Sequence, residues 1–65
     1  MSNGFVTRTD AREWAHEMLS YGIEPVTDER IERLTRYVWA HLDEPGYGIP
    51  EDDETIWRIA NDDLA

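Results

Sequence analysis

Apolar residues recur every third or fourth position in three stretches of the chain, which is the spacing of an amphipathic helix. The stretches cover residues 10–21, 28–43 and 52–64, and no segment alternates with the period of a strand. The pattern therefore predicts an all-α fold, a small compact three-helix bundle. Ile59 and Leu64 extend the buried side of the third helix. The predicted core consists of Trp14, Met18, Leu19, Ile31, Leu34, Val38, Leu42, Ile56 and Ala60.

Two capping boxes compete for the start of the first helix. Asp10 with Glu13 favours a start at residue 10, whereas Thr7 with Asp10 favours an earlier start. At the other end, Gly22 has the residue type of a left-handed helix cap. Ile23 then occupies the position at which such a cap makes its apolar contact.

The second helix has the clearest start and the clearest solvent face. Thr27 is its predicted N-cap. Glu29 with Arg33, and Glu32 with Arg36, stand four residues apart with the acid first, which is the favourable order for an ion pair. We interpret the arginines as parts of solvated ion pairs rather than as a nucleic-acid surface.

Sixty-five residues form one domain, 1–65, in which residues 1–7 are predicted to be a loose N-terminal tail. The chain has no cysteine, so it has neither a disulfide framework nor a thiolate metal site. It also has no apolar run as long as a signal-peptide core or a membrane span. We therefore expect a soluble, cytoplasmic protein that does not bind membranes.

Acidic residues outnumber basic ones and gather late in the chain. The formal net charge is −9, from 15 acids and six arginines. Residues 1–42 hold seven acids and five arginines, whereas residues 43–65 hold eight acids and Arg58 alone. Such a chain is repelled by phosphate backbones, which argues against direct nucleic-acid binding. The use of arginine without lysine is typical of a GC-rich genome, such as that of an actinobacterium or its phage.

The chain contains the word Trp-Ala-His twice, followed each time by Tyr-Gly-Ile and a proline. The first copy runs from Trp14 to Pro25 and the second from Trp39 to Pro50. The copies differ in phase: Trp14 falls inside its apolar stripe, whereas Trp39 lies about a quarter turn from the centre of its own. We interpret the repetition as two helix ends that use similar residue types, and duplication of one unit is the alternative.

Residue types that support catalysis or metal binding occur without their partners. The linker from Asp43 to Glu54 has the length of a calcium loop, but Pro45 and Tyr47 stand where ligands are needed. His16 and His41 lack zinc-protease spacing, and no serine lies in a nucleophile motif. We predict no catalytic, cofactor-binding or metal-binding residues, and we expect the protein not to be an enzyme.

The most informative surface residues are acids and large aromatic rings. Three tryptophans and three tyrosines are many rings for a small core, and such rings often anchor interfaces. The sequence therefore favours a small regulatory or inhibitory module that binds a basic surface of a protein partner. An acidic mimic of nucleic acid is the alternative, and the aromatic surplus also suggests a homodimer. The predicted partner-binding residues are Asp52, Asp53, Asp62, Asp63, Trp57 and Trp39.

Overall fold

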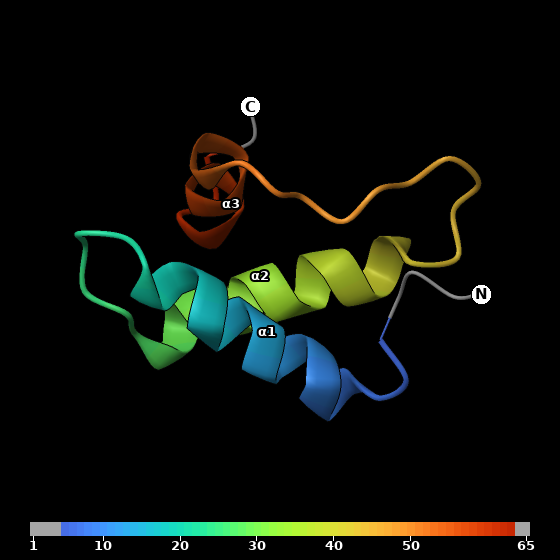
Figure 1. The fold of residues 1–65 in the computed structure, drawn as a ribbon, viewed down its shortest axis with the longest axis horizontal. Helices are drawn as coiled ribbons and strands as arrows, with labels where there is room; N and C mark the ends of the chain where they lie inside the picture. Colours follow the sequence, from blue (N-terminus) through green and yellow to red (C-terminus); the bar gives the residue numbers. More distant parts are fainter. Residues whose placement is uncertain (1–4, 64–65) are drawn as a thin grey trace.

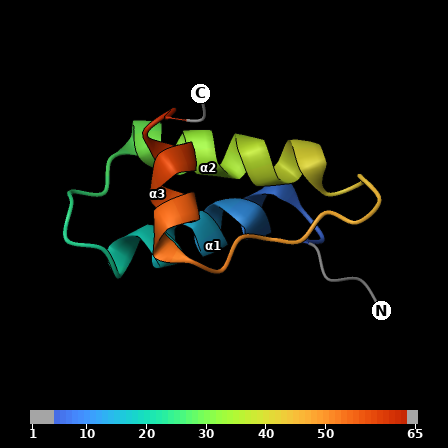
Figure 2. The same cartoon turned by 90° about the horizontal axis from the view of Figure 1, so that it is seen from above.

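The computed structural model describes residues 5–63, and its helices are α1 (Arg8–Ser20), α2 (Asp28–His41) and α3 (Asp53–Ala60). Helices α1 and α2 lie side by side and run in opposite directions, while α3 lies across one side of the pair (Figure 1). The view from above shows α3 crossing both helices near the turn that joins them (Figure 2). The predicted all-α three-helix bundle is confirmed.

The capping box of Thr7 and Asp10 starts α1, so the helix begins at Arg8 rather than at residue 10. The Thr7 hydroxyl accepts from the Asp10 amide at 3.2 Å, and the Asp10 carboxylate accepts from the Thr7 amide at 3.3 Å. Thr7 is the better cap because its side chain reaches an amide that has no partner inside the helix. Within the predicted N-terminal tail, Phe5 is half-buried and packs against Trp14 with the two rings tilted by 48°, and residues 1–4 lie outside the described part.

The core forms where small residues of α1 face larger residues of α2 and α3. Ala11 and Ala15 have no exposed surface, which lets α1 approach α2 closely, while Trp14 and Met18 sit half-buried beside them. Leu42 is also half-buried, so three of the predicted core residues lie at its edge. Leu64 lies outside the described residues. The buried apolar residues are Ala11, Ala15, Leu19, Ile31, Leu34, Val38, Ile56, Ile59 and Ala60.

Helices α2 and α3 are both shorter than predicted. Thr27 caps α2 as expected, but the helix ends at His41 instead of residue 43. In α3 the predicted first residue, Asp52, is the N-cap, and the helix ends at Ala60 instead of residue 64. The backbone turns at Asp62, whose φ is 58°, and a left-handed residue cannot continue an α-helix.

Gly22 is required by close packing rather than by a left-handed cap. The helix is capped at Tyr21, which has φ −80° and ψ −12°, and Ile23 is fully exposed, so both predictions for the end of α1 are wrong. A Cβ atom at Gly22 would lie 2.4 Å from Cζ2 of Trp57. The side chain is absent because the indole ring occupies its place.

Arg30 connects this packing to α2. Its guanidinium lies 5.5 Å from the centre of the Trp57 ring and donates to Asn61 at 2.9 Å, just beyond the end of α3. It also donates to the Pro25 carbonyl oxygen in the α1–α2 turn. Arg33 donates to the carbonyl oxygen of Ala60 at 3.3 Å. Two arginines of α2 therefore hold the C-terminal end of α3.

Of the two ion pairs predicted within α2, one is present and the other is replaced by a contact with α1. Arg33 pairs with Glu29 as expected. Glu32 pairs with Arg8 and with Arg12 of α1, the latter at 3.4 Å, instead of with Arg36. The hydrogen bond from Arg8, followed by the charges of the nearby arginines, lowers the pKa of Glu32. The pair joins the two long helices instead of bridging one turn.

Substitution of Gly22 by alanine tests the close approach of Trp57. We expect Gly22→Ala to destabilise the fold by about 1–3 kcal/mol, because the methyl group overlaps the indole ring. Gly48→Ala is the matched control, since a Cβ there meets no atom within 4 Å. Urea unfolding checks both variants, and equal stability of the two would contradict the packing role of Gly22.

Candidate protein-interaction site

The connection between α2 and α3 carries the most concentrated charge in the protein. We call residues 43–54, which include the first turn of α3, the acidic segment. It holds six acids and no basic residue. Figure 1 shows the segment extending beyond the end of α2 and then running back along the bundle to α3. Its backbone is therefore displayed along one side of the molecule.

Half of these acids have a partner inside the fold. The Asp52 carboxylate accepts from the amide and the hydroxyl of Thr55, at 2.9 and 2.8 Å. Glu44 contacts His41 at 2.7 Å, and Glu54 lies 3.9 Å from Arg58. The other three acids are exposed and have no ion-pair or hydrogen-bond partner among residues 5–63; they are Asp43, Glu51 and Asp53.

Three rings hold the start of the acidic segment against α2. His41 lies 4.4 Å from the Tyr37 ring and stacks on Tyr47 at 5.4 Å, and the two tyrosine rings are 6.5 Å apart. The Tyr47 hydroxyl is buried and has no hydrogen-bond partner in the described structure. Burial, together with nearby Tyr37 and Glu44, raises the pKa of Tyr47. The three rings hold the start of the acidic segment in place, although the Tyr47 hydroxyl is left without a hydrogen bond in the described structure.

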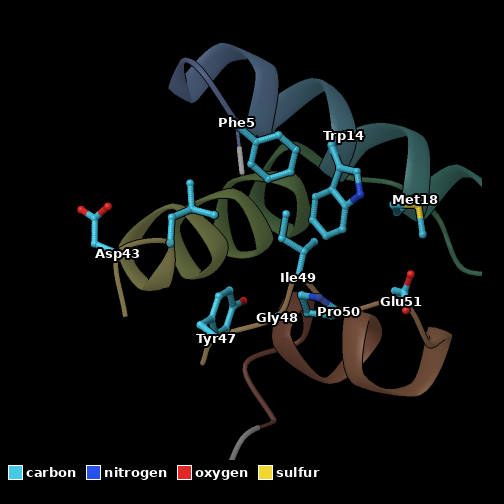
Figure 3. A pocket seen from close by; sticks show the side chains of 10 residues that line it. Phe5, Trp14, Met18, Asp43, Tyr47, Gly48, Ile49, Pro50 and Glu51 are labelled. Carbon is cyan, nitrogen blue, oxygen red and sulfur yellow. The ribbon is translucent and has the colours of Figure 1, made fainter. Parts of the chain in front are cut away.

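A groove of about 870 Å³ separates the acidic segment from α1. Phe5 and, from α1, Trp14 and Met18 line it together with Leu42, Asp43 and residues 47–51. Figure 3 shows the indole of Trp14 and the side chain of Ile49 close together in the middle, with Asp43 and Glu51 on opposite sides of them. The groove combines apolar side chains with two acids, and among the residues that the structure describes no basic side chain lines it.

The predicted partner-binding acids do not form one patch. Asp52 and Asp53 start α3, whereas Asp62 and Asp63 follow its other end, and a helix of this length spans about 12 Å. Asp62 lines a small hollow that it shares with Arg33. Its charge is therefore close to a basic group of α2 and distant from the acidic segment.

Asp62 and Asp63 form the C-terminal cap of α3. The Asp63 amide donates to the Arg58 carbonyl at 2.8 Å, and the Asp62 amide donates to the Ile59 carbonyl at 3.1 Å. With the left-handed backbone of Asp62, these bonds make a Schellman motif. The two residues satisfy carbonyl oxygens that the helix leaves free, although their charges are unfavourable at this end of the helix dipole.

The two tryptophans predicted to bind a partner have different environments. Trp57 is half-buried, packs against the core and lies between Gly22 and Arg30. Trp39 is 37% exposed and faces outward from α2. Most of the Trp57 ring is thus already used by the fold, and Trp39 is the more available of the two. Between residues 5 and 63, the most exposed large apolar residues are Val6, Tyr21 and Ile23.

Neither the two histidines nor the linker from Asp43 to Glu54 forms a recognisable metal site in the described residues. His16 is exposed, and His41 belongs to the ring cluster. Between residues 5 and 63, no three histidine or acidic side chains stand close enough to hold one metal ion. In the acidic segment the positive φ, 82°, is at Gly46 rather than at Gly48. Among the helices described, none has the length and apolar character needed to cross a membrane.

The groove was missed by sequence reasoning because its sides come from distant parts of the chain. Trp14 and Met18 looked like core residues, and Ile49 with Pro50 looked like a turn. An apolar pair between acidic runs was the only local signal. It becomes informative once the acidic segment is known to run back along α1.

No family model, curated protein or solved structure compared with the chain matches it. The function is therefore inferred from the chemistry of the groove and of the acidic segment.

The cap of α3 makes its stability sensitive to acid. The hydrogen bonds from the backbone and then the hydroxyl of Thr55 lower the pKa of Asp52. A lowered folded-state pKa stabilises the fold above the unfolded pKa, and this contribution is lost as pH falls through the folded value. Asp52→Asn keeps a capping oxygen that does not titrate. We expect the stability difference between the two proteins to change between about pH 5 and pH 2, as measured by urea midpoints. A stability difference that stays constant across this pH range would show that the Asp52 carboxylate does not contribute to the acid sensitivity of the fold.

Asp62 occupies a conformation that glycine adopts without steric penalty. A Cβ in the left-handed region is unfavourable by roughly 1–2 kcal/mol in general, and less for aspartate. Asp62→Gly also removes a negative charge from the C-terminal end of α3. We therefore expect a rise in thermal midpoint in Asp62→Gly and a fall in Asp62→Val, whose branched side chain fits this region poorly. A fall in both variants would show that the carboxylate itself stabilises the cap.

Proposed function

We propose that the protein is a non-enzymatic interaction module of the cytoplasm that binds a basic surface of a partner protein through its acidic segment. The observation that carries the proposal is the way in which the fold uses its charges. Asp43, Glu51 and Asp53 are exposed acids in a segment without a basic residue, and the fold gives them no partner among the described residues. Such charges are available to an external cation.

Four of the five arginines of the first two helices already pair with acids of the fold, whereas Arg36 makes no ion pair among residues 5–63. Arg8 and Arg12 pair with Glu32, Arg30 pairs with Glu24 at 3.3 Å, and Arg33 pairs with Glu29. Each pair is partly exposed and contributes modestly to stability. Together they leave the first half of the chain nearly balanced. The negative potential is therefore concentrated around the acidic segment, where it would steer a basic partner toward it.

A regulatory or inhibitory role follows from what binding would do. A small module without an apparent chemical centre acts by occupying the surface of its partner. Occupation of a basic surface blocks whatever else uses that surface, such as a nucleic acid or another acidic protein.

The two other candidate functions have less support. A nucleic-acid mimic needs many carboxylates on one face, yet Asp62 and Asp63 lie at the opposite end of α3 from Asp52 and Asp53. A homodimer built on Trp39 and Trp57 is weakened by the packing of Trp57 against Gly22.

Neutralisation of unpartnered acids tests the proposal. The double variant Glu51→Gln, Asp53→Asn removes two charges from the acidic segment. Its matched control, Glu13→Gln with Glu17→Gln, removes two exposed charges from α1. A partner captured from the native host should bind the first variant more weakly and more slowly than the control, because electrostatic steering is lost. Surface plasmon resonance at several salt concentrations measures both effects.

The salt dependence separates charge recognition from nonspecific damage. Exposed charges are screened beyond about 10 Å at 0.1 M salt, so the difference between variant and control should shrink as salt rises. Equal binding of the two variants at low salt would show that the acidic segment is not the binding surface.

A further inference from the structure

One residue that lines the groove between α1 and the acidic segment, Gly48, is a glycine although the fold does not require one there. Gly22 is required by the Trp57 ring, and Gly46 is required by its positive φ of 82°. Gly48 lines the groove, has no positive φ, and a Cβ built on it meets no atom within 4 Å. Neither the backbone nor an internal neighbour explains the missing side chain at this position. A larger residue would project into free space beside the groove.

The chemistry of the lining defines what the groove accepts. Its centre is apolar and partly aromatic, with the Trp14 indole and the Ile49 side chain facing the same space (Figure 3). Met18 adds a flexible thioether, which adapts to side chains of different shape. The volume, about 870 Å³, lies within the range of sites that bury a ligand. An apolar group on the ligand is therefore needed to fill the centre.

The ends of the groove add a charge requirement. Asp43 and Glu51 lie on opposite sides of the apolar centre, and no lining residue is basic. On the Glu51 side the acids continue through Glu54, beyond the groove. A small organic cation would match one end only. A peptide with basic residues on both sides of an apolar anchor would match both ends and the acids beyond them.

We propose that the groove binds a segment of the partner protein in which large apolar side chains are flanked by lysine or arginine. The inference deepens the proposed function, on which it rests, by naming the partner's recognition element. The apolar side chains enter between Trp14 and Ile49, and the flanking cations approach Asp43 on one side and Glu51 on the other.

A defined probe makes the inference testable before any partner is known. The probe is a synthetic peptide with leucine and tryptophan between two arginine-rich flanks. A second peptide replaces the leucine and tryptophan by serine and keeps every arginine. We expect the first peptide to bind at least about tenfold more tightly than the second, because only the first fills the apolar centre. Fluorescence anisotropy measures both affinities.

Two variants show where the probe binds. Gly48→Phe places a ring in the groove, and Ala40→Phe places the same ring on an exposed position of α2 that does not line it. We expect Gly48→Phe to weaken binding of the apolar probe by about tenfold or more, and Ala40→Phe to leave it unchanged. Circular dichroism checks the fold, and Gly48→Leu replaces Gly48→Phe if the larger ring unfolds the protein.

Nuclear magnetic resonance on the unmodified chain gives an independent readout. Each of the three tryptophans has one indole N–H signal, so the probe should shift the Trp14 signal and leave that of Trp39 in place. A shift of Trp39 alone would overturn the inference. Sedimentation of the free protein tests whether a second copy of the chain fills the groove. A dimer that Gly48→Phe dissociates would mean that it does, and this result would also overturn the inference.

Failure of this inference differs from failure of the proposed function. If Glu51→Gln with Asp53→Asn weakens the probe but Gly48→Phe does not, the acidic segment binds basic partners and the groove has no part in it. If the acid variant has no effect on either peptide at low salt, the proposed basic partner is itself wrong, and the inference falls with it.

Discussion

The position of α3 depends on one close contact, between the Trp57 ring and the backbone at Gly22. An eight-residue helix is too short to be stable alone in water, so packing must hold it. Ile56, Ile59 and Ala60 bury its inner face, and Trp57 extends this contact to the α1–α2 turn. Arg30 covers the ring from α2 and reaches Asn61 beyond the helix. One aromatic side chain thus joins α3 to both other helices.

The site follows from this placement of α3. Helix α2 ends at His41, far along the bundle from α3, so the acidic segment runs back beside α1 to reach Asp52 (Figure 2). The stacked rings of His41 and Tyr47 fix one end of this path, and the cap at Asp52 fixes the other. The groove is the space left between a segment held at both ends and the half-buried residues of α1.

Local signals predicted what local physics decides. The apolar stripe of α2, its cap at Thr27 and the pair of Glu29 with Arg33 all depend on residues a few positions apart. The sequence could not show that Glu32 turns to α1 or that Gly22 makes room for Trp57, because both depend on residues 20 or more positions away. The groove could not be predicted either, because the residues that line it are also far apart in the sequence. The start of α1 was misplaced because two capping boxes compete there, at Thr7 and at Asp10, and the end of α3 because the left-handed backbone of Asp62 has no clear sequence signal.

The residues that stabilise the fold differ from the acids that we propose bind a partner. The fold draws on four arginines of α1 and α2 for ion pairs, and on Asp52, Asp62 and Asp63 for the ends of α3. Asp43, Glu51 and Asp53 take no part in either task within the described residues. Like charges in one segment repel one another, which disfavours a compact state unless an opposite charge approaches. In the proposed complex, a basic partner would relieve that repulsion, so the segment's unfavourable charge in the free protein would become a source of affinity.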